Sequence, residues 1–384
     1  MKLKSTLKQY TMVIALVIVF IFFTVLTGGR LILAQNISNL LLQNAYVMVM
    51  ACGMLLCILT GGNVDLSVGA TLCLSAALAA TALQSGKSSV VAIIMAMAAA
   101  LVIGLFQGIL IGYIHVPPFI CTLAGMFLYR GLARAVLDSK TCGITNEKFL
   151  DIFSSYLRMP GEKPRACTSS LIVAVIVAVV IAACMLFSYY GKKKHGYETK
   201  PFISMLIKLI IIDALIVIYG WKLSQFKGIP VMLLWILAVV IIFAFVTSST
   251  VFGRYFYAVG GNEKATKLSG IDPRRVYFWA YFLMSALAGL SGLLVAARIG
   301  SVDGNMGNTY EMDAIASCFI GGASAYGGSG TVGGVMVGAV LLGVINQGMS
   351  IYGLPDQWQY VVKGVVLLAA VIFDVVSNKK TGKA

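Results

Sequence analysis

Long apolar runs make up most of this chain, and they limit its fold more than any other feature. Hydrophobic residues account for 59% of its 384 residues, too many for an ordinary soluble domain. Runs such as 89–114, 169–190 and 231–250 are long enough to cross a bilayer, which takes roughly 20 residues per helix. Backbone in lipid must satisfy its own hydrogen bonds, and the alternating pattern of a membrane barrel is absent. We therefore predict an all-α polytopic membrane protein.

The apolar runs predict twelve helical segments. A polar stretch at 138–168 separates the first five from the rest and is expected outside the cytoplasm. Because twelve is an even number, both termini are expected on the same side of the membrane. The predicted segments are 11–29, 40–60, 66–84, 89–114, 118–137, 169–190, 203–221, 231–250, 275–297, a short one at 311–323, 330–350 and 356–376.

Basic residues lie between the apolar runs. The net charge is +15, and every cluster of positive charge falls where the predicted topology places cytoplasm, as the positive-inside rule requires. This pattern predicts that the N- and C-termini are cytoplasmic. Anionic lipid headgroups are sufficient acidic partners, so nucleic acid is not expected. The clusters are Lys2, Lys4 and Lys8; Lys192–Lys194; Arg254 to Arg275; and Lys379, Lys380 and Lys383.

Glycine pairs interrupt the apolar pattern at two corresponding places, Gly61-Gly62 and Gly321-Gly322. The later strings GLFQGILIGYIHVPPF (104–119) and GVINQGMSIYGLPDQW (343–358) are also similar to each other. We predict two duplicated halves with broken or re-entrant helices, and matching breaks indicate a translocation path. The alternative is that glycines simply allow helices to pack closely, which we favour for Gly333, Gly334 and Gly338.

Polar residues beside the first glycine pair are candidates for that path. Asn63, Asp65 and Ser67 follow Gly62 directly, and an acid at membrane depth must be paired, hydrated or used as a cap. Asp65 either forms the N-cap of a helix that begins at Leu66 or contacts the path.

The segment 253–275 is polar in a chain that is only 11% charged. Asn262 is placed to cap a short helix with Glu263 in its first turn, Gly270 ends it, and Pro273 follows. We interpret this helix as a docking element for a cytoplasmic partner; the alternative is a solvated loop helix without one.

No catalytic pattern is evident. Ser85-Gly86-Lys87-Ser88 is similar to the end of a phosphate-binding loop, but Thr81 stands where that motif needs glycine. His115 and His195 lack metal-ligand spacing, so we expect no metal site and no enzyme activity. The energy source is expected in another chain. Spacing leaves open a disulfide between Cys142 and Cys167.

Three motifs in order resemble one known family. They are TGGNVDLSVG (60–69), FGRYFYAVGGNEKATKLSGI (252–271) and YEMDAIASCFIGGAS (310–324). Together they are similar to the permease subunits of bacterial ABC sugar importers of the ribose, galactose and xylose type. The resemblance runs from about 36 to 376 and looks closest to the longer xylose and multiple-monosaccharide permeases.

The resemblance implies one transmembrane permease domain, 1–384, with about ten core helices. It divides into an N-terminal repeat (36–137), an insert with an extra helical hairpin (138–221), a coupling loop (252–275) and a C-terminal repeat (276–376). It further implies a bacterial cytoplasmic (inner) membrane, a second permease copy or close paralogue, an external sugar-binding protein, and an ABC ATPase subunit that holds ATP and Mg. The hairpin is expected to serve packing or assembly.

The resemblance also assigns residues to the contact with the ATPase. The coupling helix runs from Asn262 to Gly270, and its expected contact residues are Asn262, Glu263, Lys264, Ala265, Thr266 and Gly270. The family commonly has Glu-Ala-Ala where this chain has Lys264, Ala265 and Thr266, so the charge is reversed at one contact position.

A monosaccharide path should offer amide, hydroxyl and aromatic groups. The candidates are Asn63, Asp65, Ser67, Gln107, Tyr113, Asn346 and Gln347, each of which could instead form an interhelical hydrogen bond. Glu311 and Asp313 are expected at the external mouth, where a binding protein docks, unless they cap a helix. The alternative function is an ion-coupled secondary sugar transporter, for which Asp65 is the candidate carboxylate.

Overall fold

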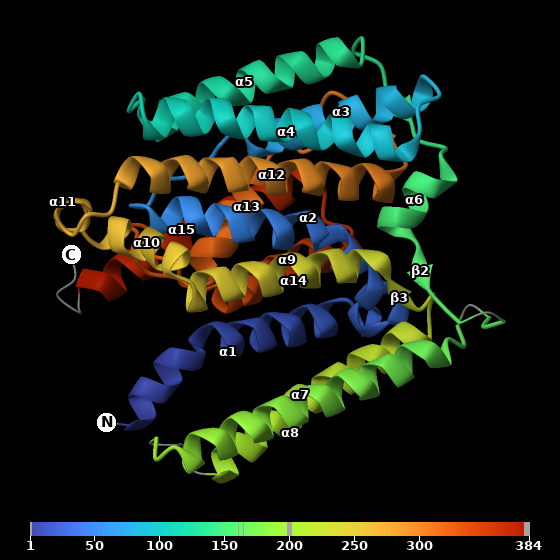
Figure 1. Ribbon diagram of the computed structural model, residues 1–384. Coiled ribbons are helices and arrows are strands. Elements are labelled where there is room, and N and C mark those ends of the chain that lie inside the picture. The colour runs from blue at the N-terminus through green and yellow to red at the C-terminus, as the bar shows by residue number, and fades with distance from the viewer. Residues whose placement is uncertain (1, 160, 164, 198–201, 380–384) are drawn as a thin grey trace. The chain divides into compact units, whose positions relative to one another are not determined.

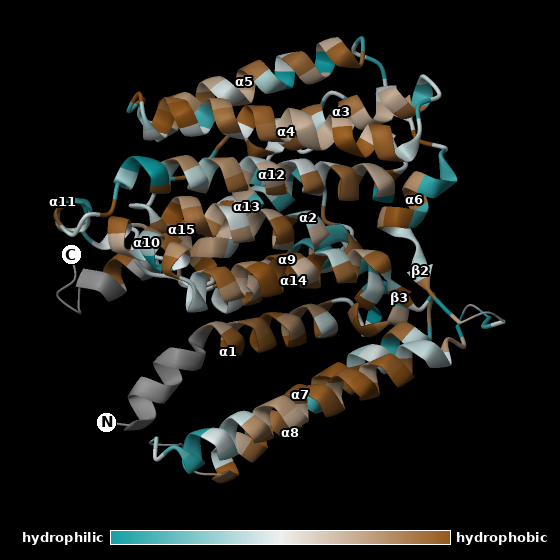
Figure 2. Cartoon of the chain, in the orientation of Figure 1, coloured by the Kyte–Doolittle hydropathy of each residue, from teal (hydrophilic) through white to brown (hydrophobic). Residues whose placement is uncertain are grey.

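The computed structural model describes residues 2–159, 161–163, 165–197 and 202–379, so Lys380 and Lys383 lie outside the described residues (Figure 1). Within that part the chain forms fifteen α-helices and four two-residue strands. This confirms the all-α prediction, and each of the twelve predicted segments is helical. Eight helices are long and apolar enough to cross a membrane: α2, α4, α5, α7, α8, α9, α12 and α14 (Figure 2).

The helices form two compact units. The larger unit holds Leu40–Ser154 together with the chain up to Leu31 and from Met232. Its helices are α1 (Lys2–Leu26), most of α2 (Ala34–Leu59), α3 (Val68–Gln84), α4 (Ser89–Gly112), α5 (Pro118–Val136), α6 (Glu147–Ser154), α9 (Val231–Ser249), α10 (Val251–Gly261), α11 (Glu263–Leu268), α12 (Pro273–Ile299), α13 (Tyr310–Ile320), α14 (Val332–Tyr352) and α15 (Asp356–Lys379).

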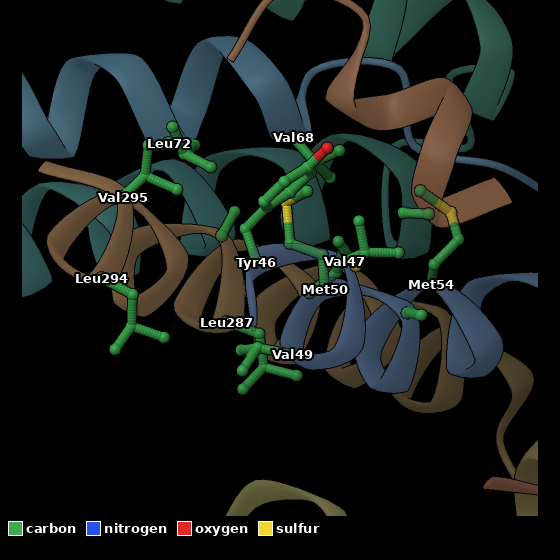
Figure 3. Close-up of a cluster of buried hydrophobic side chains, with 14 of the residues drawn as sticks. Tyr46, Val47, Val49, Met50, Met54, Val68, Leu72, Leu287, Leu294 and Val295 are labelled. Atoms are coloured by element: carbon green, nitrogen blue, oxygen red, sulfur yellow. The ribbon is translucent and has the colours of Figure 1, made fainter. Parts of the chain in front are cut away.

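Helix α2 lies at the centre of the larger unit. Every residue from 44 to 60 is buried, which fits a helix that is apolar on all sides and enclosed by protein. Tyr46, Met50 and other α2 side chains pack toward Val68 and Leu72 of α3 and toward Leu287 of α12 (Figure 3). Helix α12 packs along α4 and α3, while α14 packs on α1 and α13. Strand β1 (Cys142–Gly143) pairs antiparallel with β4 (Ser301–Val302).

The smaller unit holds Ile32–Asn39 and Ser155–Val231. Helices α7 (Thr168–Lys194) and α8 (Phe202–Ser224) form a hairpin in it, in close contact where Gly220 meets Ala174. Strand β2 (Tyr156–Leu157) pairs antiparallel with β3 (Ile229–Pro230) and brings the two ends of this insert together. Cys142, in the larger unit, and Cys167, in the smaller, are both free and buried.

Two local boundaries differ from the sequence prediction. The helix predicted from residue 66 begins at Val68, so Asp65 is not its N-cap. The segment 251–261, expected as loop, is helical because Thr250 accepts a hydrogen bond from the backbone N–H of Gly253 at 3.0 Å. The coupling loop is therefore two helices, α10 and α11, joined at Asn262.

Candidate coupling site and permeation path

Helix α11 is the short capped helix that the sequence predicts. The side chain of Asn262 accepts a hydrogen bond from the backbone N–H of Ala265 at 3.0 Å, and Glu263 lies in the first turn. Gly270 has φ +85°, a conformation that favours glycine and ends the helix. Helix α11 projects beyond the end of α12, at the end of the larger unit where α1 starts and α15 finishes (Figure 1).

The surface of α11 has an anchored side and an open side. Thr266 is buried, and its hydroxyl donates to the carbonyl oxygens of Ala258 and Asn262, both at 2.8 Å. Thr266 therefore fixes α11 to α10 and does not face outward as an ATPase contact. Lys264 and Ala265 are exposed, and Leu268 is 90% exposed. A leucine this open on a small rigid helix gives a partner protein an apolar contact.

Glu263 connects α11 to a membrane helix. Its carboxylate accepts a hydrogen bond from the hydroxyl of Tyr277 on α12 at 3.1 Å. Beneath this contact is a cavity of about 330 Å³, whose lining includes Asn63 and His115 as well as Glu263, Lys267 and Tyr277. Asn63, predicted in the path, thus lies beside α11. Tyr113, another predicted path residue, is about half exposed and packs edge-on against Phe278.

The first glycine break holds a hydrogen-bonded chain of three predicted residues. One carboxylate oxygen of Asp65 accepts from the backbone N–H of Ser67 at 2.8 Å and from its hydroxyl at 2.7 Å. The side-chain amide of Gln107 then donates to the Ser67 hydroxyl at 2.7 Å. The Asp65 side chain thus forms hydrogen bonds with the residue two positions later, as aspartate side chains commonly do in turns. These bonds hold residues 66 and 67 in a turn before α3.

Two tyrosines that sequence reasoning missed lie near this chain. Tyr129 of α5 and Tyr281 of α12 are buried and close enough to interact electrostatically with Asp65. The hydroxyl of Tyr281 and the second carboxylate oxygen of Asp65 have no hydrogen-bond partner among the described residues, whereas the Tyr129 hydroxyl lies close to the Gln107 side chain. Buried polar atoms of this kind normally bind water or a ligand. The sequence did carry a signal for these two residues, since each is a tyrosine within an otherwise apolar run.

The predicted amides of the second repeat do not join this cluster. Gln347 is buried and Asn346 half-buried, and both lie on α14. Helix α14 packs on α1 and α13, whereas α4, which holds Gln107, packs on α3, α5 and α12. The candidate path residues thus fall into two separate packing groups.

The expectation that Glu311 and Asp313 face a binding protein needs correction. Both are buried in the first turn of α13, with Asp313 only 1% exposed. Asp313 accepts a hydrogen bond from the hydroxyl of Tyr46 at 2.7 Å and forms an ion pair with Lys363 at 3.0 Å. A carboxylate enclosed in this way belongs to the interior of the chain, and Lys363 of α15 is the partner that sequence reasoning missed.

These elements define a class: an all-α polytopic membrane protein with two helix breaks and a projecting loop helix. The chain belongs to the family of branched-chain amino acid transport system permease components, whose model matches residues 36–371. This confirms that it is a permease.

Relatives extend the similarity to the whole chain. It is 34% identical to the xylose transport system permease protein of Haemophilus influenzae, over 99% of both chains. It is 31% identical to the xylose transport system permease protein of Escherichia coli K12, over 99% of this chain and 95% of that one. It is 33% identical to the ribose import permease protein of Bacillus subtilis, over 88% of this chain and 84% of that one. No solved structure shows a significant match.

Proposed function

We propose that this chain is the membrane subunit of an ATP-driven importer that passes a monosaccharide, a pentose in the first instance. The relatives that match it over almost their whole length are permeases named for xylose and ribose. The family description names branched-chain amino acids, whereas these relatives are named for sugars. Because the similarity to the sugar permeases covers the full length, it favours a sugar over an amino acid as the transported solute.

The observation on which the proposal mainly rests is α11. It is capped by Asn262, anchored by Thr266, and presents Lys264, Ala265 and Leu268 outward. An ABC ATPase subunit that holds ATP and Mg would dock on this side. Lys264 would meet an acidic or neutral position on the ATPase, since it carries a positive charge where the resembling family has glutamate.

The remaining parts of the importer follow from the same proposal. The proposed membrane is the bacterial cytoplasmic membrane, with both termini on its cytoplasmic side. In support of this, α1 starts and α15 finishes at the end of the larger unit that carries α11 (Figure 1). An external sugar-binding protein delivers the sugar, and a second permease copy or close paralogue completes the path. Lipid surrounds the exposed apolar faces, such as that of α8, on which few residues are buried.

The polar groups at the first break suit a neutral, hydroxyl-rich substrate. Asp65, Ser67 and Gln107 form a hydrogen-bonded chain, and the hydroxyls of Tyr129 and Tyr281 lie near it. In the proposed cycle, opening of the break exposes these groups, and sugar hydroxyls replace their internal partners. Exchange of one hydrogen bond for another has little net cost, so such a path holds sugar weakly and releases it.

The test uses proteoliposomes that contain the permease, its cognate ATPase and the binding protein. Ala265→Trp places a bulky side chain on the open side of α11 and should lower ATPase co-purification and sugar uptake at least tenfold. Ala265→Ser, which keeps a small side chain, should leave both within twofold. Unchanged assembly and uptake in Ala265→Trp would mean that α11 is not the docking helix.

Two outcomes would replace the proposal. Sugar uptake that follows an ion gradient and ignores ATP would establish the secondary transporter. ATP-dependent uptake of leucine, with no uptake of xylose or ribose under the same conditions, would establish an amino acid permease. Radiolabelled xylose, ribose and leucine in parallel assays separate these results.

A further inference from the structure

The two glycine breaks touch each other through their backbones. The first break is 60–67, between α2 and α3, and the second is 321–331, between α13 and α14. The backbone N–H of Gly328 donates to the carbonyl oxygen of Leu59 at 3.0 Å. Gly62 lies so close to Ala325 that a Cβ at position 62 would overlap the Ala325 carbonyl oxygen. Breaks that are far apart in sequence therefore form one packed junction.

The end of α10 belongs to the same junction. A Cβ at Gly260 would overlap the carbonyl oxygen of Leu59 and lie 2.6 Å from the backbone nitrogen of Gly328. Tyr257, one turn earlier, donates its hydroxyl to the carbonyl oxygen of Gly330 at 2.9 Å. Glycine at 260 lets the backbone of α10 contact both breaks directly, as small residues do where membrane helices approach closely.

Helix α11 cannot move without the last turn of α10. Asn262 ends α10 and also caps α11. The buried hydroxyl of Thr266 bonds to Ala258, two residues before Gly260. A displacement of α11 is therefore passed to the residues that contact both breaks.

We propose that Gly260 and Tyr257 are positioning residues through which a displacement of α11 reaches both glycine breaks in one step. The proposal rests on the proposed function, in which an ATPase docks on α11. Contacts between backbones have no flexible side chain that could absorb the displacement, and packed interiors transmit strain. The Gly328–Leu59 hydrogen bond keeps the two breaks together, so both halves of the permease respond to one motion.

Adjacent glycines supply a matched pair of variants. Gly260→Ala inserts a methyl group into the junction, whereas a Cβ at Gly261 meets nothing within 4 Å. Both substitutions replace a glycine in the last turn of α10 by alanine. In proteoliposomes with the ATPase and binding protein, Gly260→Ala should lower the sugar imported per ATP hydrolysed at least tenfold while the ATPase still co-purifies. Gly261→Ala should keep this ratio within twofold of the unmodified complex.

A second pair tests the same junction without added volume. Tyr257→Phe removes only the hydroxyl that bonds Gly330, and should lower the sugar-to-ATP ratio about fivefold, the effect of one lost hydrogen bond. Tyr255 lies on the same helix, and its hydroxyl makes no hydrogen bond to any of the described residues, so Tyr255→Phe should leave the ratio unchanged. If Gly260→Ala does not fold, the comparison of Tyr257→Phe with Tyr255→Phe tests the proposal by itself.

The outcomes separate this inference from the proposed function. If the unmodified complex shows no ATP-driven sugar uptake, the proposed function and this inference both fail. If the unmodified complex is coupled but Gly260→Ala and Tyr257→Phe match their controls, only the inference is overturned. Loss of ATPase binding in Gly260→Ala would also overturn it, because the defect would then lie at the docking surface.

Discussion

At the scale of single residues, Asp313 is a buried charge held by partners on two other helices. It joins three helices, because Tyr46 lies on α2, Asp313 on α13 and Lys363 on α15. Its side chain is 2% exposed and that of Lys363 is 23% exposed. A buried charge that loses its partner is costly, although the intact pair contributes little net stability.

Lys363→Met is therefore expected to lower the free energy of unfolding by about 3–5 kcal/mol, since it leaves the Asp313 carboxylate buried without its cation. Chemical unfolding in detergent measures this change. The matched control is Lys140→Met, which breaks the exposed pair between Lys140 and Asp138 and should have no measurable effect. The double variant Asp313→Asn with Lys363→Met should recover most of the loss; no recovery would mean that Lys363 acts through packing.

At the scale of elements, the cap of α11 decides how well that helix is formed before a partner binds. Asn262→Ala removes the side-chain acceptor for the Ala265 N–H and should cost about 1 kcal/mol of helix stability. Binding of the ATPase to permease in nanodiscs should weaken about fivefold, because binding must then order the helix. Asn262→Ser keeps a capping oxygen and should bind normally. Equal affinity of the two variants would contradict this role of the cap.

The first turn of helix α7 is expected to depend on pH through Glu162. The Glu162 carboxylate accepts hydrogen bonds from the Ser169 hydroxyl at 2.5 Å, the Ser169 backbone N–H at 2.6 Å and the Thr168 hydroxyl at 2.9 Å. These hydrogen bonds lower the pKa of Glu162 from 4.5 to about 2, and the bond from the Ser169 hydroxyl has the largest effect. Because the folded pKa is depressed, the stabilisation is present above the unfolded pKa of 4.5 and is lost as the pH falls toward 2.

Hydrogen exchange at the Ser169 amide, corrected for the intrinsic rate, tests this. Protection should be constant above about pH 5 and fall between 4.5 and 2. Glu162→Gln cannot ionise, so its protection should be lower and independent of pH in that window. Identical profiles for the two proteins would show that another group controls the start of α7.

Sequence patterns predicted the elements well and their partners poorly. Apolar runs located the helices, since their length is set by the bilayer, and the Asn262–Gly270 pattern located α11, since caps are local. The burial of Asp313 depends on Lys363, and no local pattern relates residues fifty positions apart. The contact of Gly260 with Leu59 likewise depends on three segments meeting in space, which is decided by packing.

At the scale of the whole molecule, the helical hairpin of the smaller unit begins and ends at one pair of strands. Strands β2 and β3 pair Tyr156 with Pro230 and Leu157 with Ile229. Ser155 precedes β2 and Val231 follows β3, and the backbone N–H of Val231 donates to the carbonyl oxygen of Ser155 at 2.9 Å. Chain enters and leaves the α7–α8 hairpin at one place, so the hairpin can be removed without separating the ends that belong to the larger unit.

Replacement of residues 158–228 by Asn-Gly is expected to leave a folded, transporting permease. Asn-Gly forms the two-residue turn that suits a tight hairpin, and it would connect Leu157 to Ile229, which are already paired. Two quantities are measured: the yield of monodisperse protein in detergent and the rate of ATP-driven sugar uptake. Both should be within about threefold of those of the full chain if the hairpin serves only packing or assembly.

The control deletion extends back through α6, where Phe149 and Phe153 are buried in the core of the larger unit. It should abolish folding, because each lost phenylalanine costs about 3–5 kcal/mol. An excised protein that folds but imports no sugar would instead assign the hairpin to transport.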